Sequence, residues 1–401
     1  MSLLHDLAAQ GGKPVRSTPM PARMAFGPDE MGMVQEVFAY YQQRQGDPGY
    51  QGHFEQRYCA DFCRMMGGGY ADAVATGTAA VYVAIAALGL PAGSEILVSP
   101  ITDPGSVNAV IQAGCRPKLV DSKPGHYNVG PEQIAARIGP NTKAALVVHS
   151  TGQAAEIDAI VSVCHDRGVR VIEDCSQAHL ARWKGRPVGG FGDIAAFSTM
   201  YRKASITGAS GGVVYTRDEE LFHQALAWAD RGKTPWVEGF DEKDPAQFMV
   251  PALNLHTDEL SCAVGIASLA RLPGTIAARL AYVQGLDRLN EVSRFCRPIG
   301  WAEGDSPFIY PIVVDTTALP VSKTDFARMV AAEGIGLNPD YRYLVADWPY
   351  LQPFATDRFE TPNARAIRDS SFNLFVNEKY GPQELEDTLA AIVKVETCLT
   401  R

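Results

Sequence analysis

Short apolar runs alternate with segments of helical length between residues 70 and 216. The runs lie at 71–76, 95–100, 116–121, 143–150, 169–174 and 193–198, and helical patterns between several of them cover 78–89, 105–113, 131–138 and 155–167. Short continuous apolar strands separated by helices are typical of a mainly parallel sheet with both faces covered. A further run at 211–216 follows a glycine-rich turn, so it is a candidate antiparallel strand. The pattern predicts a large α/β domain.

The sequence on either side of this core is less regular. Helices are predicted at 28–45, 258–295, 323–333 and 382–397, with a strand at 308–314 and a stretch rich in proline and aromatic residues at 338–354. We expect residues 1–260 to form an N-terminal arm and the large domain, and residues 261–401 to form a linking helix and a smaller C-terminal α+β domain. Segment 230–257 is too long for a simple connection, and such loops are usually functional or contact a partner subunit.

The composition is that of a soluble globular enzyme. Of 401 residues, 46% are hydrophobic and 20% charged, and the net charge of -9 comes from acidic and basic residues that are interspersed along the chain. This pattern indicates no nucleic-acid partner, although it does not exclude a local basic pocket for a phosphorylated substrate. No run of about 18 apolar residues is present, and the first residues lack the pattern of a secretory signal. We therefore expect no membrane span and a cytoplasmic location.

The eight cysteines form no recognisable metal or disulfide pattern. Cys59 and Cys63 are four residues apart, and no Cys-x-x-Cys pair or Cys/His set has the spacing of a zinc site. In a chain of this length, reduced and buried thiols are the default expectation. The cysteines therefore agree with a reducing compartment, and we expect no metal.

Three strand ends carry residues that suit one cofactor, and the first is VIEDCSQAH at 171–179. Asp174 stands at the carboxyl end of an apolar strand, where parallel sheets bind their ligands. A carboxylate there can pair with the pyridinium nitrogen of pyridoxal phosphate (PLP), which makes the cofactor an effective electron sink. Gln177 could present its amide to the phenolic oxygen of the same ring. Taken alone, the two residues also fit a solvated aspartate and a surface glutamine.

The second strand end is FSTMYRKASITGASGG at 197–212. Lys203 lies in a loop flanked by hydroxyl residues and glycines, where it could form a Schiff base with an aldehyde. Such a lysine must be deprotonated to attack, and burial or a nearby positive charge such as Arg202 would lower its pKa. Ser198, at the end of the preceding strand, has a hydroxyl suited to a phosphate oxygen. A lone lysine in a loop, however, is more often a solvated charge.

The third strand end is ATGTAAVYVAIAALGL at 75–90. Gly77 and Thr78 open a helix directly after a strand, and the free N–H groups and dipole of a helix start bind phosphate. Gly77 permits close approach of the backbone, and Thr78 can add a hydroxyl. The alternative is an ordinary helix start with threonine as its N-cap.

A phosphate cradle, a strand-end aspartate and then a lysine follow the order of PLP enzymes with the aspartate-aminotransferase-like (type I) fold. The chain further resembles the DegT-type (DegT/DnrJ) family of PLP-dependent amino-sugar aminotransferases, which act on keto sugars, often nucleotide-linked, and on cyclitols. The motifs that carry the resemblance are GTAA (77–80), VHSTGQAAEIDAI (148–160), VIEDCSQAH (171–179), FSTMYRK (197–203) and NLHTDEL (254–260). The resemblance is clear over residues 20–290 and loose in the C-terminal part.

The resemblance assigns roles to residues of these motifs: Lys203 as the Schiff-base lysine, Asp174 on the pyridine nitrogen, Gln177 on the phenolic oxygen, and Gly77, Thr78 and Ser198 on the phosphate. Asn254 matches an asparagine that reaches the phosphate from the neighbouring subunit in such enzymes. The resemblance therefore implies a homodimer with a shared active site. His149, at the end of its strand, is either a pocket residue or a packed core histidine.

Three departures from the family pattern surround the substrate side of the pocket. Asp103 and Pro104 stand where an aromatic residue usually stacks on the cofactor ring, so Asp103 is a candidate contact to cofactor and substrate. The turn GASGG at 208–212 is one residue longer than the usual GEGG. His256 stands where an arginine often follows the asparagine. These changes therefore bear on the identity of the substrate more than on cofactor binding.

The favoured hypothesis is an aminotransferase that takes an amino group from glutamate or glutamine and passes it to a keto sugar or cyclitol. A sugar dehydratase of the same family is an alternative, but such enzymes replace the lysine with a histidine. A non-catalytic regulatory protein with the same fold is a second alternative. The presence of Lys203 argues against the dehydratase, and the intact lysine, aspartate and phosphate cradle argue against the regulatory protein.

Overall fold

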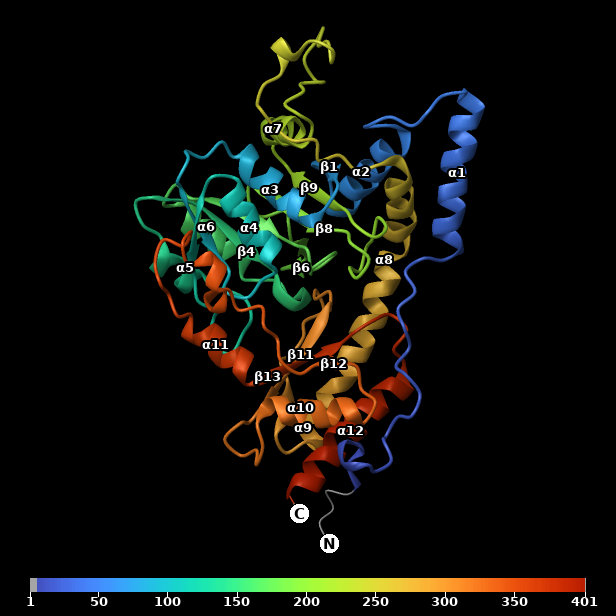
Figure 1. Ribbon diagram of the computed structural model, residues 1–401, viewed down its shortest axis with the longest axis vertical. Coiled ribbons are helices and arrows are strands. Elements are labelled where there is room, and N and C mark those ends of the chain that lie inside the picture. Colours follow the sequence, from blue (N-terminus) through green and yellow to red (C-terminus); the bar gives the residue numbers. More distant parts are fainter. Residues whose placement is uncertain (1–5, 401) are drawn as a thin grey trace.

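The computed structural model describes residues 6–400, which form two main sheets joined by the long helix α8 (Glu259–Gly285) (Figure 1). A third, two-stranded sheet pairs β6 (Arg182–Trp183) with β7 (Arg186–Pro187). The large sheet has the order β1 (Tyr70–Val74), β9 (Gly212–Thr216), β8 (Ile194–Ser198), β5 (Arg170–Asp174), β4 (Thr142–Val148), β2 (Glu95–Val98) and β3 (Arg116–Leu119). Strands β8, β5, β4, β2 and β3 pair in parallel. Strand β9 is antiparallel to both β8 and β1. The expected α/β sheet and its antiparallel member are therefore confirmed.

Helices cover both faces of the large sheet, as a parallel sheet requires. One core holds Ile96 and Val98 together with α3 (Gly77–Ala87) and α4 (Pro104–Gln112), and Leu97 between them belongs to the opposite core beside α6 (Ile157–His165). The remaining helices of this part are α2 (His53–Met66), α5 (Pro131–Arg137) and α7 (Glu219–Ala229). Because side chains alternate along a strand, Glu173 and Asp174 of β5 point to opposite faces.

The C-terminal sheet is antiparallel, in the order β10 (Cys296–Pro298), β11 (Ile309–Val314), β13 (Ser371–Phe375) and β12 (Leu337–Asn338). It is accompanied by α9 (Leu289–Val292), α10 (Lys323–Ala332), α11 (Pro362–Asp369) and α12 (Pro382–Thr400). Leu7, from the start of the described chain, is fully buried in this core. The N-terminal arm therefore packs on the C-terminal part before α1 (Pro28–Arg44) runs beside α8 (Figure 1).

The helix expected at 258–295 is interrupted. α8 ends at Gly285, a 3-10 turn follows at Leu286–Arg288, and α9 completes the segment. Among the described residues, this stretch from Glu259 to Val292 is the one helix long and apolar enough to cross a membrane. Within this stretch, 61% of the apolar 18-residue window is buried in the molecule, as expected of a core helix.

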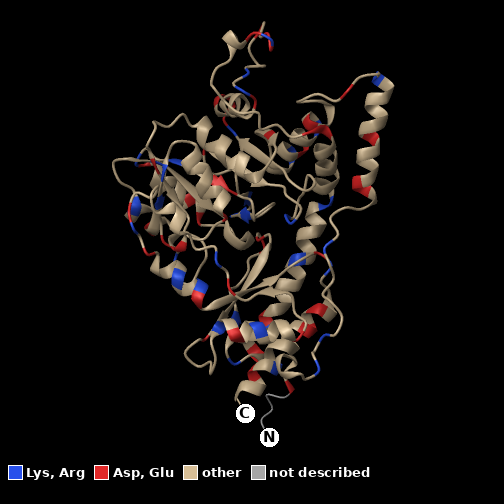
Figure 2. Ribbon diagram, viewed as in Figure 1, with Lys and Arg blue, Asp and Glu red and all other residues tan. Residues whose placement is uncertain are grey.

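Segment 230–257 is irregular and extends beyond α7, away from the sheets (Figure 1). It contains a 3-10 turn at Pro245–Gln247 and returns to the large domain through single bridges that pair Asp230 with Asn254 and Val74 with His256. Acidic and basic residues are interspersed over both parts of the ribbon (Figure 2).

Candidate active site

The carboxyl ends of β5 and β8 and the first turns of α3 and α4 surround one pocket of about 220 Å³. Its lining includes all the expected site residues except Asn254, namely Gly77, Thr78, Asp103, Asp174, Gln177, Ser198 and Lys203. These residues are far apart in the sequence. They meet because the carboxyl ends of neighbouring parallel strands share one edge of the sheet.

The start of α3 forms a cradle in which position 77 has no room for a side chain. A Cβ added to Gly77 would lie 2.5 Å from the Cβ of Ser198. The N-cap of the helix is Thr76, one residue before the Gly77–Thr78 pair that the sequence indicated. The Thr76 side chain accepts a hydrogen bond from the N–H of Ala79. The free N–H groups of the first turn, with the hydroxyls of Thr78 and Ser198, form a site suited to a phosphate group.

Asp174 is buried and held by two donors. Ser106 donates from its Oγ to Asp174 Oδ2 at 2.6 Å, and the backbone N–H of Ser176 donates to Oδ1 at 3.0 Å. Ser106 itself accepts a hydrogen bond from Thr102. This network presents an oriented carboxylate on the side of the sheet that faces α4.

Gln177 is oriented by the chain around it. Its Oε1 accepts a hydrogen bond of 2.8 Å from the N–H of Thr151, a residue with a positive φ of 63°. The side chain also interacts with the hydroxyl of Tyr341, which comes from the C-terminal part. Since the carbonyl oxygen is occupied by Thr151, the amide N–H groups are directed elsewhere, and one can donate to a phenolic oxygen.

Lys203 lies half-buried in the pocket with its Nζ 4.5 Å from the centre of the Phe308 ring. Burial lowers the pKa of Lys203, although Asp174 and Asp103 act in the opposite direction. A lowered pKa increases the fraction of neutral amine, which is the nucleophilic form. The nearby His179 is buried and donates to the carbonyl of Ser198, and burial and the charge of Lys203 lower its pKa to about 3. His179 is thus neutral at physiological pH.

Asp103 is the N-cap of α4, and its Oδ1 accepts a hydrogen bond of 2.9 Å from the N–H of Gly105. Its side chain is exposed at the mouth of the pocket. Asp103 and Pro104 therefore form an ordinary helix start, and Asp103 also lines the site.

Asn254 is exposed and lies outside the pocket of its own chain. Its Nδ2 donates to the hydroxyl of Tyr50 at 3.2 Å, and its Oδ1 accepts from the N–H of His256. His256 stacks on Tyr50 with 4.3 Å between ring centres and pairs with Asp230. These contacts hold Asn254 in a defined orientation at the molecular surface.

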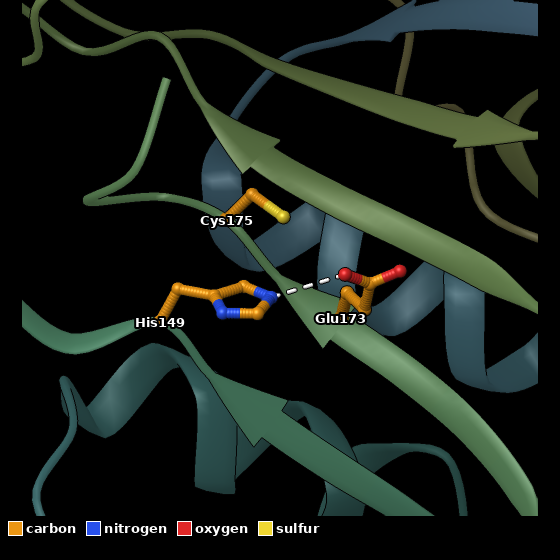
Figure 3. A group of neighbouring side chains, drawn as sticks. All are labelled: His149, Glu173 and Cys175. Carbon is orange, nitrogen blue, oxygen red and sulfur yellow. Dashed lines mark hydrogen bonds and ion pairs between the residues drawn. The ribbon is translucent and has the colours of Figure 1, made fainter. Parts of the chain in front are cut away.

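His149 is a packed core histidine rather than a pocket residue. Its Nδ1 accepts from the N–H of Ala155, so its Nε2 carries the proton that is donated to Glu173 (Figure 3). The Glu173 oxygens also accept hydrogen bonds from the N–H groups of Gly189, Phe191 and Gly192. His149, Glu173 and Cys175 lie close enough to bind a metal, but the glutamate is already fully hydrogen-bonded, which indicates a structural group.

Several pocket residues were not predicted from the sequence. Ser106, Thr102, Ser176 and Ser210 lie in segments already expected near the site, so their hydroxyls were available as a signal. Phe308 and Tyr341 come from the C-terminal part, and nothing in their local sequence indicates that they approach Lys203 and Gln177.

The residues present fit PLP. The Gly77 cradle suits its phosphate, the oriented Asp174 suits its ring nitrogen, the free amide of Gln177 suits its phenolic oxygen and the Lys203 amine suits its aldehyde. The fit rests on the chemistry of the donor set and on a cradle that any side chain at position 77 would fill.

Known proteins resemble the chain along nearly its whole length. A protein of Streptoalloteichus tenebrarius, provisionally named L-glutamine:3-amino-2,3-dideoxy-scyllo-inosose aminotransferase, is 28% identical over 98% of both chains. The structure of an aminotransferase from Psychrobacter cryohalolentis superposes with a TM-score of 0.86 at 25% identity and covers 96% of this chain and 100% of that one. The E. coli GDP-4-keto-6-deoxy-D-mannose-3-dehydratase with bound hydrated PLP has a TM-score of 0.84 at 22% identity, covering 94% and 99%, and shows the shared fold.

The family model of the DegT/DnrJ/EryC1/StrS aminotransferases matches residues 33–393. This match and the structural neighbours confirm the expected type I fold, the aminotransferase class and PLP as the cofactor. The chain therefore belongs to the DegT/DnrJ/EryC1/StrS aminotransferase family.

Proposed function

We propose that this enzyme moves an amino group from glutamate or glutamine to the ketone of a cyclitol or keto sugar, with Lys203 as the residue that carries PLP. The observation that supports it most is the meeting of Lys203, Asp174 and the Gly77 cradle in one pocket. The relative from Streptoalloteichus tenebrarius is named for a glutamine donor and a cyclitol ketone, which favours the same substrate classes here.

Each pocket residue would have one task. Bound PLP supplies an electron sink that makes the proton on the amino-bearing carbon acidic. Asp174 would hold a proton on the ring nitrogen, and Gln177 would orient the ring through its amide. The Nζ of Lys203 would accept the proton from carbon and return it, since no other lysine lines the pocket among the described residues. Gly77, Thr78 and Ser198 would anchor the phosphate.

The presence of Lys203 also distinguishes this proposal from a dehydratase, since the lysine is the base that returns the proton in transamination. Seven of the eight cysteines, those other than Cys398, are free thiols and five of these seven are buried, which supports action in a reducing compartment such as the cytoplasm.

A spectrophotometric experiment tests the proposal. The purified protein with PLP is expected to be yellow, to lose its visible band when L-glutamine or L-glutamate is added, and to recover it when a keto cyclitol or keto sugar follows. A colourless protein would support a non-catalytic role. A band that no amino donor alters would contradict transamination.

We also propose a homodimer in which Asn254 of one subunit completes the phosphate site of the other. Asn254 is oriented by Tyr50 and His256 but lies outside its own pocket. Exposed apolar side chains surround it, with Leu253 at 61% and Tyr50 at 55% exposure. Leu260 and Phe38 of α1 are also exposed, and they line one shared hollow. Apolar patches of this kind mark protein interfaces, and a second copy of the chain is the occupant that would place Asn254 at a phosphate.

Subunit complementation tests the shared site. Lys203→Ala and Asn254→Ala are co-expressed with different tags, and the mixed dimer is isolated. If Asn254 acts across the interface, one site of the mixed dimer carries both substitutions and the other carries neither. The isolated mixed dimer should therefore regain about half of the native activity. If both residues serve the same subunit, no site is intact and activity stays at the level of the variants. An active monomer would also contradict the proposal.

A further inference from the structure

Arg23 links the N-terminal arm to the loop that carries Lys203. Its Nη1 donates to the carbonyl of Tyr201 at 2.7 Å and its Nη2 donates to the carbonyl of Ala204 at 3.3 Å. One guanidinium therefore bridges the residues on both sides of the lysine. Its N–H groups form a rigid planar fork, so they fix the separation of two acceptors in a way that a lysine cannot.

Glu378 connects Arg23 to a second arginine. Its Oε1 lies 3.0 Å from Arg23 Nε, and its Oε2 lies 2.9 Å from Nη2 of Arg279 in α8. Burial would raise the pKa of Glu378, but Arg279 and Arg23 outweigh it and lower that pKa below its usual value. The carboxylate is therefore ionised at neutral pH and binds both guanidinium groups.

Arg279 extends this cluster to the other side of the lysine. Only 1% of it is exposed, and its Nη1 donates to the carbonyl of Pro307 at 3.2 Å. Pro307 precedes Phe308, whose ring lies against Lys203 Nζ. The Arg23–Glu378–Arg279 cluster thus fixes both the loop that bears the lysine and the ring on which its amine rests.

The cluster joins three distant parts of the chain: the N-terminal arm, α8 and the segment after β13. The arm is held at the same place by Asn377, whose Nδ2 donates to the carbonyl of Pro21 at 2.9 Å. Burial, then the charge of Lys203 and those of Arg279 and Arg23, lower the pKa of His179, so both arginines act on the same interior region as the lysine. The lysine loop is consequently set by the packing of the arm and the C-terminal part.

We propose that Arg23 is a positioning residue for Lys203. Arg23 holds the loop that carries Lys203 in the geometry that the lysine amine needs to bond with PLP. The inference rests on the proposed function of Lys203. It assigns the N-terminal arm a role in the active site, although no described residue of the arm lines the pocket.

The test measures how fast PLP becomes covalently fixed, a readout independent of turnover. Cofactor-free protein is mixed with PLP, reduced with borohydride at intervals and weighed by mass spectrometry. We expect Arg23→Ala to slow fixation about tenfold or more, because small displacements of a reacting group cost large factors in rate. Non-covalent PLP binding, followed by fluorescence, should persist through the phosphate cradle.

Arg16→Ala is the matched control. Arg16 lies in the same arm and pairs with Glu384 and Asp387 of α12 at 3.0 and 2.7 Å, and the hydrogen bonds and ion pairs of its side chain lie within the arm and α12. Both variants should lower the melting temperature, whereas fixation in Arg16→Ala should stay within about twofold of wild type. Equal slowing in the two variants, or wild-type fixation in Arg23→Ala, would overturn the proposal.

Arg23→Lys serves if Arg23→Ala does not fold. It keeps the charge but spans only one of the two carbonyls, so fixation should still slow by about threefold or more. Wild-type fixation in this variant would also overturn the proposal. If the wild type does not fix PLP, the proposed function is refuted and this inference with it. If the wild type fixes PLP and an Arg23 variant fixes it at the same rate, this inference alone is refuted.

Discussion

Ser106 donates a hydrogen bond to Asp174, with 2.6 Å between the serine Oγ and the carboxylate Oδ2. The two residues belong to neighbouring layers, Ser106 to the first turn of α4 and Asp174 to the end of β5. The contact therefore orients the carboxylate from the helix side, while the N–H of Ser176 holds its other oxygen. Two fixed oxygens leave the carboxylate little rotational freedom, which suits a group that must face a ring nitrogen.

Asp174→Ala should bind PLP weakly and reduce turnover by orders of magnitude, because a neutral pyridine is a poorer electron sink and each unit of ring pKa lost is worth about 1.4 kcal/mol. Ser106→Ala retains the charge and should reduce turnover about tenfold or less. Steady-state kinetics of both variants check the prediction. Near-native turnover in Asp174→Ala would show that the aspartate is not a cofactor partner.

Asp103 caps the start of α4 and also lies at the mouth of the pocket. Two substitutions distinguish the capping role from a role in substrate binding. Asp103→Asn keeps a good N-cap and removes the charge, whereas Asp103→Ala removes both and should cost about 1 kcal/mol of stability. We expect both variants to slow the half-reaction with the keto substrate more than the half-reaction with the amino donor. Rapid-mixing absorbance measurements separate the two half-reactions. Equal damage to both in Asp103→Asn would exclude a role in substrate choice.

Gly77→Ala should reduce the affinity for PLP, because the added Cβ would lie 2.5 Å from the Cβ of Ser198 and close the cradle. Overpacking of this kind also costs about 1–3 kcal/mol of stability. Gly274→Ala is the control, since Gly274 is an exposed residue of α8 whose added Cβ would meet nothing within 4 Å. It should leave PLP binding unchanged and stabilise the helix by about 0.5–1 kcal/mol. Fluorescence titration with PLP and urea unfolding compare the variants, and equal PLP affinity in both would contradict the cradle.

Glu173 gives the fold a predictable dependence on pH. Burial would raise its pKa, but hydrogen bonds from His149 and backbone N–H groups lower it below the usual value. A group with a lowered native pKa stabilises the fold above the unfolded-state pKa, and this stability is lost as the pH falls through the native pKa. We expect the wild type to lose stability as the pH falls below about 4.3, the ordinary glutamate value.

Glu173→Gln should lower the free energy of unfolding at pH 7 by about 2–4 kcal/mol, since an amide cannot accept from all the donors that surround the carboxylate. Its stability should also fall less steeply with acid than that of the wild type. Urea unfolding at pH 7 and at pH 4 measures both effects. An unchanged free energy with an unchanged pH dependence would contradict the structural role.

Much of the large sheet could be predicted because its strands are continuous apolar runs separated by helices. The convergence of Asp174, Lys203 and Gly77 followed from the rule that parallel strand ends share an edge. The helix α2 was missed although Phe54, Tyr58, Phe62 and Met66, which it buries, recur every four residues. The capping role of Asp103 was missed too, although an aspartate followed by proline is a helix-start pattern.

Other contacts depend on packing between distant parts of the chain, so the local sequence gives no signal for them. Phe308 and Tyr341 contact Lys203 and Gln177 only because the C-terminal part packs against the large sheet. Arg23 lies 180 positions before Lys203 in the chain and meets its loop only through the fold. The fate of His149 was open, since a histidine at a strand end faces the pocket or the opposite layer according to the register of the strand.

The most direct test of the account is the location of the PLP linkage. The holoenzyme is reduced with borohydride, digested and analysed by peptide mass spectrometry, beside Lys203→Ala treated in the same way. We predict that the cofactor is found on Lys203 in the wild type and on no residue in the variant. A reduced linkage on another lysine, or a linkage that persists in Lys203→Ala, would contradict the assignment on which the proposed mechanism depends.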